Sequence, residues 1–468
     1  MNQVKLQLII SPDDTFPTRA DMILPQALVK KWRITMHTPV TLSCGSAVTS
    51  TRLLYSRHAN KNRIVRIRET VAHTLGLYQD CHINLRYYSE YRHCQIGPML
   101  GILTNGIDKR LPDAQRFSEM TRFYTECHLS AEAHGIRMFI FSPEDLHVQT
   151  KRIDGWTYVN GRWKQRTHPL PDVIYNRITS RRIEAQENLQ QKLQWLKRRH
   201  RTQLFNERFL DKWQVHSALE RDPEIRLMLP ETRRYEQVRQ LKQMLSRYSV
   251  VYIKPAGGSL GQGVMRLTLK GTRCHMQYTT LNGTITKSNV TFQEIARQMI
   301  RRSRQNKYLI QQGLPLITSL GRTIDFRALV QKNGSGQWTV TSITGRIAGD
   351  TNIVSNLARG GTIATVPRIL KQVDPLLPKP SISQLRQKAL AVAHAFERQV
   401  SGHFAELGID LAADRNGKVW LLEINSKPSK TDDAVTNPSL IIRPSVRKTM
   451  EYTCFITRYP QRASKKRR

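Results

Sequence analysis

The chain has 468 residues, 39% of them hydrophobic, which fits a folded protein of about three domains and excludes a disordered chain. Lys and Arg number 74 against 36 Asp and Glu, so the formal net charge is +38. Such an excess favours an anionic partner, whether nucleic acid, an acidic polymer or a membrane surface. The sequence has no apolar run long enough to span a bilayer, no convincing export signal and no CxxC pair, so we expect a cytoplasmic protein with reduced thiols.

The first two regions of the chain differ in their pattern of apolar residues. Residues 1–90 hold short apolar stretches separated by turns, which predicts a small β-rich domain. In residues 91–205, apolar segments at IGPMLGILTN, RMFIF and DVIYNRI alternate with a helical pattern that ends at Gly135, so we predict a βαβ unit on a parallel sheet. Within this region, the Arg- and Gln-rich residues 181–205 predict a solvated helix between domains.

Residues 206–435 predict a third, larger unit. Strands are expected at SVVYIKP, KYLIQQGLPL, IDFRALV and WTVTSITGRIA, and helices at TFQEIARQMIRRSRQ and at the long amphipathic segment that ends at Gly402. Residues 436–468 predict a C-terminal basic tail, which ends in ASKKRR. Together these elements predict a mixed α/β (α+β) fold.

Two short segments near the C-terminus predict an oxygen-rich cluster. HFAELGID ends at Asp410, WLLEINSKP carries Glu423 and Asn425, and DRNGK between them has hairpin-turn chemistry. Strand side chains alternate between faces, so Glu423 and Asn425 point the same way and the hairpin brings Asp410 beside them. Two carboxylates and an amide oxygen suit Mg²⁺ shared with phosphate better than zinc.

A lysine followed by glycines gives a weaker signal upstream. Lys254 ends an apolar strand and is followed by Gly257, Gly258, Gly261 and Gly263. Glycines let backbone N–H groups turn toward a phosphate, but a glycine-rich hairpin turn has the same composition. The segment is neither a Walker A pattern nor a dinucleotide-binding fingerprint, so both interpretations stay open.

Several other residues are ambiguous in the same way. The strand YLIQQGLPL breaks at Gly313, where free backbone groups could bind a planar base or merely end the strand. Asp325 and Arg327 share one strand face, and they form either an ion pair or contacts to a ribose and a phosphate. Arg359 in SNLARGG is a candidate clamp for a negatively charged intermediate, with a surface turn as the alternative. Lys212 begins a helix, where a lone lysine is ordinarily solvated.

The order of these signals along residues 206–435 resembles the ATP-grasp superfamily, most specifically in Asp410…Glu423-x-Asn425 with Lys254 upstream. Within that superfamily, the segments IGPMLGILTNG, DKWQVHSALERDPEIRLMLPET, KPAGGSLGQGV and LLEINSKPSK are similar to the YheC/YheD family, which is described as endospore-coat-associated. This likeness spans nearly the whole chain. It implies an ATP-grasp fold, preceded by a pre-ATP-grasp βαβ domain and a small N-terminal β-rich domain.

The resemblance also implies roles for individual residues. ATP would contact Lys212, Lys254, Gly257, Gly258, Ser259, Gly261, Gly263, Gln311, the backbone at Leu314 and Asp325. One or two Mg²⁺ ions would be held by Asp410, Glu423 and Asn425. Arg327 would lie near the transferred phosphoryl group and Arg359 would face the substrate. Gln311 departs from the acidic residue that several relatives carry at the adenine hinge, which leaves the choice of nucleotide open.

The implied reaction is that of a ligase. A substrate carboxylate would attack the γ-phosphate of ATP, and an amine or thiol would then displace phosphate from the acyl-phosphate. The sequence names neither substrate, although the basic surface fits an acidic peptide or wall polymer, and the family description points to spore-coat components. Two alternatives stay open: an ATP-binding structural or assembly component of the spore coat without turnover, and a basic protein that binds nucleic acid.

Overall fold

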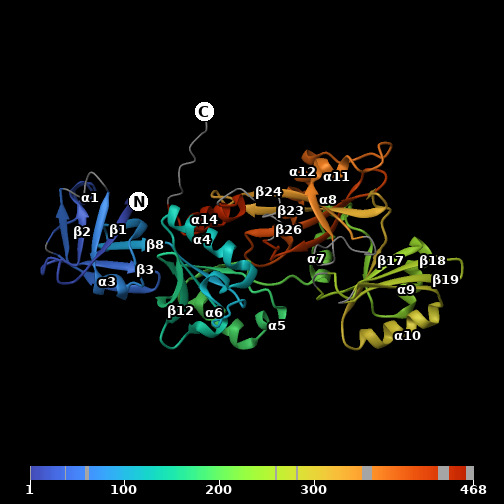
Figure 1. The fold of residues 1–468 in the computed structure, drawn as a ribbon, viewed down its shortest axis with the longest axis horizontal. Coiled ribbons are helices and arrows are strands. Elements are labelled where there is room, and N and C mark those ends of the chain that lie inside the picture. The colour runs from blue at the N-terminus through green and yellow to red at the C-terminus, as the bar shows by residue number, and fades with distance from the viewer. Residues whose placement is uncertain are drawn as a thin grey trace.

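Four β-sheets follow one another along the chain in the computed structural model, and Figure 1 shows them spread along the long axis of the molecule. The N-terminal sheet lies at one end, a central sheet follows, and the two later sheets make up the other end. The structure describes residues 2–36, 38–57, 63–258, 261–280, 283–349, 361–430 and 442–459.

The first sheet has eight strands in the order β4-β3-β8-β7-β1-β6-β2-β5. They are β1 (Asn2–Ser11), β2 (Met22–Pro25), β3 (Val40–Cys44), β4 (Ala47–Thr51), β5 (Leu53–Ser56), β6 (Ile64–Arg68), β7 (Cys81–Tyr88) and β8 (His93–Gly97), with helices α1 (Gln26–Trp32) and α3 (Glu69–Thr74). Strand β8 pairs with both β3 and β7, so the sheet continues past the predicted boundary at residue 90. We therefore propose a first domain boundary near Gly97.

The central sheet contains the predicted βαβ unit, whose strand pairing is parallel as expected. Its order is β11-β12-β10-β9-β14-β15, with β13 paired to β12, and β9 runs parallel to both β10 and β14. The strands are β9 (Met99–Leu103), β10 (Arg137–Phe141), β11 (Leu146–His147), β12 (Arg152–Val159), β13 (Arg162–Pro169), β14 (Val173–Asn176) and β15 (Gln203–Phe205). Helix α4 (Thr121–Ala133) connects β9 to β10, and Gly135 follows it with a φ of +69°, as its predicted place at the helix end requires.

Residues 181–205, expected to form a solvated helix, are mostly helical but bury one face. The segment forms α5 (Arg181–Glu184) and α6 (Glu187–Arg199). Leu189, Leu193 and Leu196 recur at helical spacing along α6 and are buried in a hydrophobic core shared with the first sheet and the central sheet. The polar residues between them face outward, which explains why the composition alone suggested a solvated helix.

The third sheet is antiparallel, in the order β16-β21-β17-β18-β19-β20. Its strands are β16 (Thr232–Arg234), β17 (Val250–Pro255), β18 (Met265–Lys270), β19 (Arg273–Thr280), β20 (Gly283–Val290) and β21 (Tyr308–Gln312), with helices α9 (Val238–Tyr248) and α10 (Phe292–Ser303). Helix α10 begins with a capping box in which the side chains of Thr291 and Glu294 each accept a hydrogen bond from the other residue's backbone N–H.

The fourth sheet has the order β25-β24-β23-β26-β27, with β22 paired to β23. Its strands are β22 (Thr318–Ser319), β23 (Arg322–Lys332), β24 (Trp338–Ile347), β25 (Thr362–Thr365), β26 (Glu406–Ala413) and β27 (Val419–Asn425), with helices α7 (Lys212–Leu219), α8 (Pro223–Arg226), α11 (Val366–Leu370) and α12 (Ile382–Gln399). The apolar stripe of α12, which includes Leu385, Val392 and Phe396, is buried in the core that also contains β23 and β26.

The C-terminal region 436–468 is not wholly the basic tail that composition predicts. Helix α14 (Pro444–Ile456) lies within it and buries Val446 and Met450 against Phe123 and Tyr124 of α4. Figure 1 shows α14 beside α4, between the central sheet and the fourth sheet. The basic residues that end the chain obscured an apolar pattern at helical spacing that precedes them. The terminal ASKKRR lies outside the described residues.

All six cysteines are described, and each is buried with a free thiol. Within the described part of the chain, no helix combines the length and apolar character needed to cross a membrane.

We predict that Met450→Ala, which empties a fully buried position on α14, lowers the free energy of unfolding by about 2–5 kcal/mol. Arg447→Ala, at an exposed position of the same helix, serves as the control and should change it by less than about 0.5 kcal/mol. Urea unfolding of the purified variants measures both. Equal unfolding midpoints would contradict the packing of α14 against α4.

Candidate functional site

A pocket opens between the third sheet and the fourth sheet, near α7. Its empty space, counting the part open to solvent, is about 580 Å³. Four of the residues predicted to bind ATP or metal line it together: Lys212, Lys254, Gln311 and Glu423. They come from α7, β17, β21 and β27, so two sheets and a helix must pack correctly to form the pocket.

Lys212 reaches the pocket because helix α7 begins at that residue. The side chain of Asp211 caps the helix by accepting a hydrogen bond from the backbone N–H of Gln214 at 2.9 Å. The Lys212 ammonium lies 3.3 Å from Oε2 of Glu423. The predicted phosphate-binding lysine and the predicted metal-binding carboxylate are therefore direct neighbours.

Lys254 and Gln311 face the pocket from neighbouring antiparallel strands. Nζ of Lys254 donates a hydrogen bond to Oε1 of Gln311 at 2.5 Å, and Nε2 of Gln311 donates to Oγ1 of Thr232 at 3.0 Å. Burial lowers the pKa of Lys254 to about 8, the nearby charge of Lys212 contributes, and Glu423 and Asp410 oppose the shift. An anion placed here would gain from a lysine that lacks a carboxylate at contact distance among the described residues.

Sequence reasoning missed the apolar wall of this pocket. The wall is made by Val215, Leu219, Leu229, Leu309, Leu421 and Ile424. A wall of this kind suits the flat face of a nucleobase. The apolar residues around Glu423 on β27 were visible in the sequence. Their pattern, however, does not say which apolar residues line a pocket and which fill a core.

The predicted hairpin is present, and its register brings the oxygen donors together. Asp410 on β26 is paired with Glu423 on β27, and Gly408 with Asn425. In the turn, Oδ1 of Asp414 accepts hydrogen bonds from the backbone N–H groups of two following residues at 2.9 and 3.0 Å. Gly417 adopts a positive φ of +79° as expected from the turn composition.

Asp410 is tied to two arginines. Its carboxylate accepts hydrogen bonds from Nε and Nη2 of Arg327, its partner on the neighbouring strand β23. It also lies 3.1 Å from Nη2 of Arg346 on β24. Burial raises the pKa of Asp410, but the two guanidinium groups outweigh burial and hold that pKa below its ordinary value. Asp410 is therefore ionised at neutral pH.

Asp325 and Arg327 do not pair with each other. Asp325 instead accepts two hydrogen bonds from Arg346, at 2.5 and 2.9 Å, and it is 4% exposed. Sequence reasoning missed Arg346, although a charged residue inside the apolar strand WTVTSITGRIA was a usable signal. A contact between Asp325 and a ribose would require this buried pair to open.

The donor chemistry of Asp410, Glu423 and Asn425 fits Mg²⁺, because all three offer oxygens from one face of the hairpin. Within the described residues, no three His, Cys, Asp or Glu side chains gather into a metal-binding group. The predicted set has only two such side chains, and its third ligand is the amide of Asn425. Both carboxylates already face cations. A metal held here would replace contacts that Arg327, Arg346 and Lys212 now make.

The remaining predicted residues lie outside the described lining of the pocket. The loop after β17 has positive φ angles of +66° at Gly261 and +69° at Gly263, while a Cβ at Gly257 would meet nothing within 4 Å. Leu314 follows β21, where the strand ends as predicted, and Gly313 packs so tightly that a Cβ would lie 2.5 Å from Val250. Ser259 and Arg359 lie outside the described residues.

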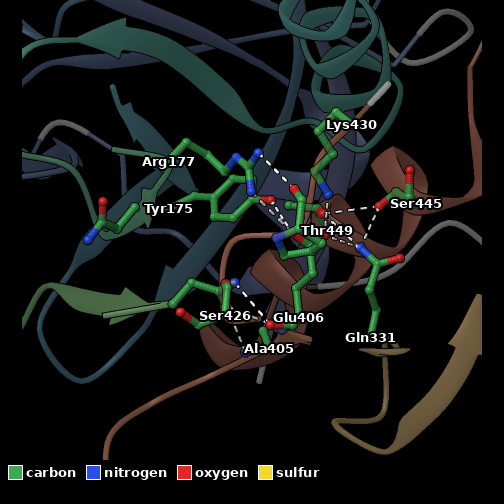
Figure 2. Close-up of polar contacts among 12 residues, drawn as sticks. Tyr175, Arg177, Gln331, Ala405, Glu406, Ser426, Lys430, Ser445 and Thr449 are labelled. Carbon is green, nitrogen blue, oxygen red and sulfur yellow. Dashed lines mark hydrogen bonds and ion pairs between the residues drawn. The ribbon is translucent and has the colours of Figure 1, made fainter. Parts of the chain in front are cut away.

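A second buried cluster holds the base of the hairpin, and sequence reasoning did not anticipate it. Figure 2 shows Glu406, the first residue of β26, surrounded by donors. Its carboxylate accepts hydrogen bonds from Tyr175 at 2.9 Å and from Gln331 at 2.8 Å, forms an ion pair with Lys430, and lies 3.5 Å from Arg177. Burial raises the pKa of Glu406, but the two cations outweigh it and hold that pKa below its ordinary value.

The Glu406 cluster ties three parts of the chain to the hairpin. Tyr175 belongs to the central sheet, Gln331 to β23, and Lys430 to the segment after β27. Gln331 also donates a hydrogen bond to the backbone carbonyl of Ser445 on α14 at 3.0 Å. Because Glu406 and Asp410 lie on the same face of β26, the cluster helps fix the strand that carries the predicted metal ligand.

The comparisons with known proteins agree with the fold. Residues 201–456 match the family described as YheC/D like ATP-grasp, and the chain belongs to that family. It is 30% identical over 416 residues to the endospore coat-associated protein YheD of Bacillus subtilis (strain 168), covering 88% of this chain and 90% of that protein. It is 25% identical over 333 residues to YheC of the same organism, covering 70% and 88%.

The fold is therefore a mixed α/β ATP-grasp fold, which implies ATP binding. Among solved structures, D-alanyl-alanine synthetase A from Vibrio cholerae matches with a TM-score of 0.43 and 10% identity, over 77% of this chain and 99% of that chain. The ADP complex of the purK N5-carboxyaminoimidazole ribonucleotide synthetase matches with a TM-score of 0.44 and 15% identity, over 78% of each chain.

The lowered pKa of Lys254 predicts a pH dependence of ATP affinity. Lys254 is protonated below about pH 8 and loses its charge above it, so affinity should hold near neutrality and fall as the pH rises through that value. Lys254→Arg stays protonated throughout and should remove the fall. Competition titrations with a fluorescent nucleotide at several pH values measure this. The same fall in both proteins would show that another group causes it.

We predict that Glu406→Gln lowers the free energy of unfolding by about 3–5 kcal/mol, because Lys430 and Arg177 would stay buried without their counter-charge. The matched control is Glu224→Gln, which removes an exposed ion pair with Lys388 and should cost at most about 1 kcal/mol. Urea unfolding at neutral pH measures both. Similar values for the two variants would contradict the stabilising role of the cluster.

Proposed function

We propose that this protein is a Mg-ATP-dependent ligase that joins a carboxylate to an amine or a thiol through an acyl-phosphate. The observation that carries the proposal is the convergence of Lys212, Lys254, Gln311 and Glu423 on one pocket, with Asp410 paired to Glu423 at its edge. Membership of the ATP-grasp family supports the nucleotide, and the mixed apolar and charged lining supports its orientation.

The residues of the pocket would each do part of the binding. The apolar wall and the amide of Gln311 would hold the base, and Lys254 and Lys212 would neutralise phosphate oxygens. Asp410, Glu423 and Asn425 are the residues that would hold Mg²⁺. When bound, Mg²⁺ offsets the negative charge of the phosphates. Lys212 and the arginines released from the carboxylates would then be available to the phosphates.

The chemistry needs positioning and charge neutralisation, and no nucleophile from the protein. A carboxylate oxygen of the substrate attacks the γ-phosphorus of ATP, the bond to the bridging oxygen breaks, and ADP leaves. An amine or thiol then attacks the carbonyl carbon of the acyl-phosphate and releases inorganic phosphate. Arg327, which lies against Asp410, is the residue that we propose to contact the transferred phosphoryl group, and Arg359 is proposed to face the substrate.

The location and the substrates are proposed on separate grounds. Both curated relatives are named as endospore coat-associated proteins, and we extend that association to this chain, with the cytoplasm as its place of action. A net charge of +38 attracts anions over long distances, so an acidic peptide or wall polymer is the proposed acceptor or acid.

The proposal is tested by trapping the intermediate. Purified protein is incubated with Mg-ATP, hydroxylamine and a series of acids that includes amino acids and acidic peptides. An acyl-phosphate reacts with hydroxylamine to give a hydroxamate, which iron(III) colours. We expect a hydroxamate with at least one acid and a matching amount of ADP. Tight ATP binding without any hydroxamate across the series would contradict ligase activity.

In the same assay, Glu423→Gln should reduce turnover about a hundredfold or more, since a charged donor for the metal is lost. Glu423 is the sharper target because its side chain is 31% exposed, whereas Asp410→Asn also leaves two buried arginines with one fewer acceptor. Glu224→Gln, on the surface, should leave turnover unchanged. Wild-type rates in Glu423→Gln with an intact fold would remove this residue from the site.

One observation favours a second candidate, a coat component that binds ATP without turnover. Asp410 and Glu423 are each paired with a cation, so the hairpin is neutralised by the protein itself. If those pairs persist when ATP binds, no metal enters, and nucleotide binding should be independent of magnesium. Titration with ATP in the presence and absence of EDTA separates the two candidates.

A further inference from the structure

A second pocket lies where the first sheet meets the central sheet, far along the molecule from the pocket described above. Its empty space, counting the part open to solvent, is about 330 Å³. The segment after α3 supplies Gly76, Tyr78 and Gln79, and the central sheet supplies Arg137, Phe139 and His168. Figure 1 shows α3 and β12 toward the N-terminal end, and α7 and β17 toward the opposite end.

The walls of this pocket are held in place by contacts between the two sheets. The Tyr78 hydroxyl donates a hydrogen bond to the backbone carbonyl of Thr167, and Nε2 of Gln79 donates to that of Tyr158 at 3.1 Å. A Cβ on Gly76 would come within 2.6 Å of Pro169, so the segment sits closely on β13. The pocket is therefore formed before any ligand arrives.

Arg137 is unusual among the buried cations of the described chain. Lys430, Arg177, Arg346 and Arg443 each pair with a carboxylate, and Arg86 donates to backbone carbonyls and covers the ring of Tyr459. Arg137 is 8% exposed, it makes no ion pair with a described residue, and its Nη1 has no hydrogen-bond partner. A buried guanidinium without a counter-charge costs several kcal/mol unless other acceptors satisfy it, as backbone carbonyls do for Arg86, so the unpartnered Nη1 of Arg137 favours an anion in this pocket.

His168, which lines the same pocket, and Cys81, which interacts with Arg137, do not supply that negative charge. His168 is buried, its ring stacks on Phe139 at 4.4 Å, and its Nε2 is hydrogen-bonded to Thr157 at 2.9 Å. Burial, together with the charge of Arg137, lowers the pKa of His168 to about 3, so this ring is neutral. Burial raises the pKa of the Cys81 thiol, which Arg137 only partly opposes, so the thiol is also neutral.

We propose that this pocket binds a small organic carboxylate, which pairs with Arg137 and rests its apolar body on Leu77, Met138 and Phe139. A planar guanidinium matches a carboxylate with two parallel hydrogen bonds. A single cation suits one negative charge, and it suits the more highly charged, strongly hydrated phosphate poorly. The site is separate from the ATP pocket, so its ligand need not be a substrate.

The test uses the full-length protein and a matched set of small molecules. Benzoate, its uncharged analogue benzyl alcohol and inorganic phosphate are each titrated by calorimetry, and their effect on thermal unfolding is recorded. We expect benzoate to bind and to raise the unfolding temperature, benzyl alcohol to do neither, and phosphate to bind more weakly than benzoate. Absence of benzoate binding at millimolar concentration, equal binding of benzyl alcohol, or tighter binding of phosphate would each overturn the proposal.

Variants locate the binding site. Arg137→Gln should weaken benzoate binding about tenfold or more, because charge-assisted hydrogen bonds are lost. Arg162→Gln, which removes an exposed charge from neighbouring β13, and Lys254→Gln, in the other pocket, should leave it unchanged. Undiminished binding in Arg137→Gln, or loss in Lys254→Gln, would place the ligand elsewhere. If Arg137→Gln fails to fold, Arg137→Lys replaces it, since a lysine keeps the charge but not the two parallel hydrogen bonds and should also weaken benzoate binding.

Discussion

The pairing of Asp410 with Glu423 across the β26–β27 hairpin is the constraint on which the candidate site depends. Strand side chains alternate between faces, so this one register places three oxygen donors together, whereas a slip by one residue would turn them toward the opposite face. The register is secured at both ends of β26. Asp414 organises the turn, and Glu406 fixes the other end through contacts with the central sheet, β23 and the segment after β27. The hairpin that we propose to hold magnesium is thus positioned by residues that do not touch the pocket.

Charge balance explains why this arrangement is stable without a ligand. Arg346 is shared by Asp325 and Asp410, so two buried carboxylates have two guanidinium groups between them once Arg327 is counted. Among the described residues of these pairs, the charges of the two signs balance. If Mg-ATP binds here as we propose, binding is an exchange in which the metal takes over the carboxylates and the polyphosphate takes over the cations. The free energy lost when the existing ion pairs break would then be offset by the new ion pairs.

Local patterns in the sequence predicted most of the fold, but they did not predict which distant residues contact each other. The turn composition around Gly417, the strand break at Gly313 and the helix start at Lys212 are all local signals, and the structure confirms each. The partner of Asp325 could not be read in this way, because Arg346 lies on another strand and only the β23–β24 register brings them together. Helix α14 was hidden for a related reason. Its apolar positions matter only when α4 lies opposite, and a basic tail dominated the composition.

The +38 net charge acts through solvent, whereas the charges in the two pockets act at contact distance. Few of the Lys and Arg residues that the structure describes are buried, among them Arg86, Arg137, Arg177, Arg346, Lys430 and Arg443, so most of the net charge lies at the surface. Surface charges act through water and salt, and their attraction fades over about 8 Å at physiological ionic strength. Buried charges act at contact and are screened far less. Anions drawn to this protein by its surface charge would therefore meet a few buried cations, and Arg137 differs from Arg177, Arg346, Lys430 and Arg443 in making no ion pair with a described residue.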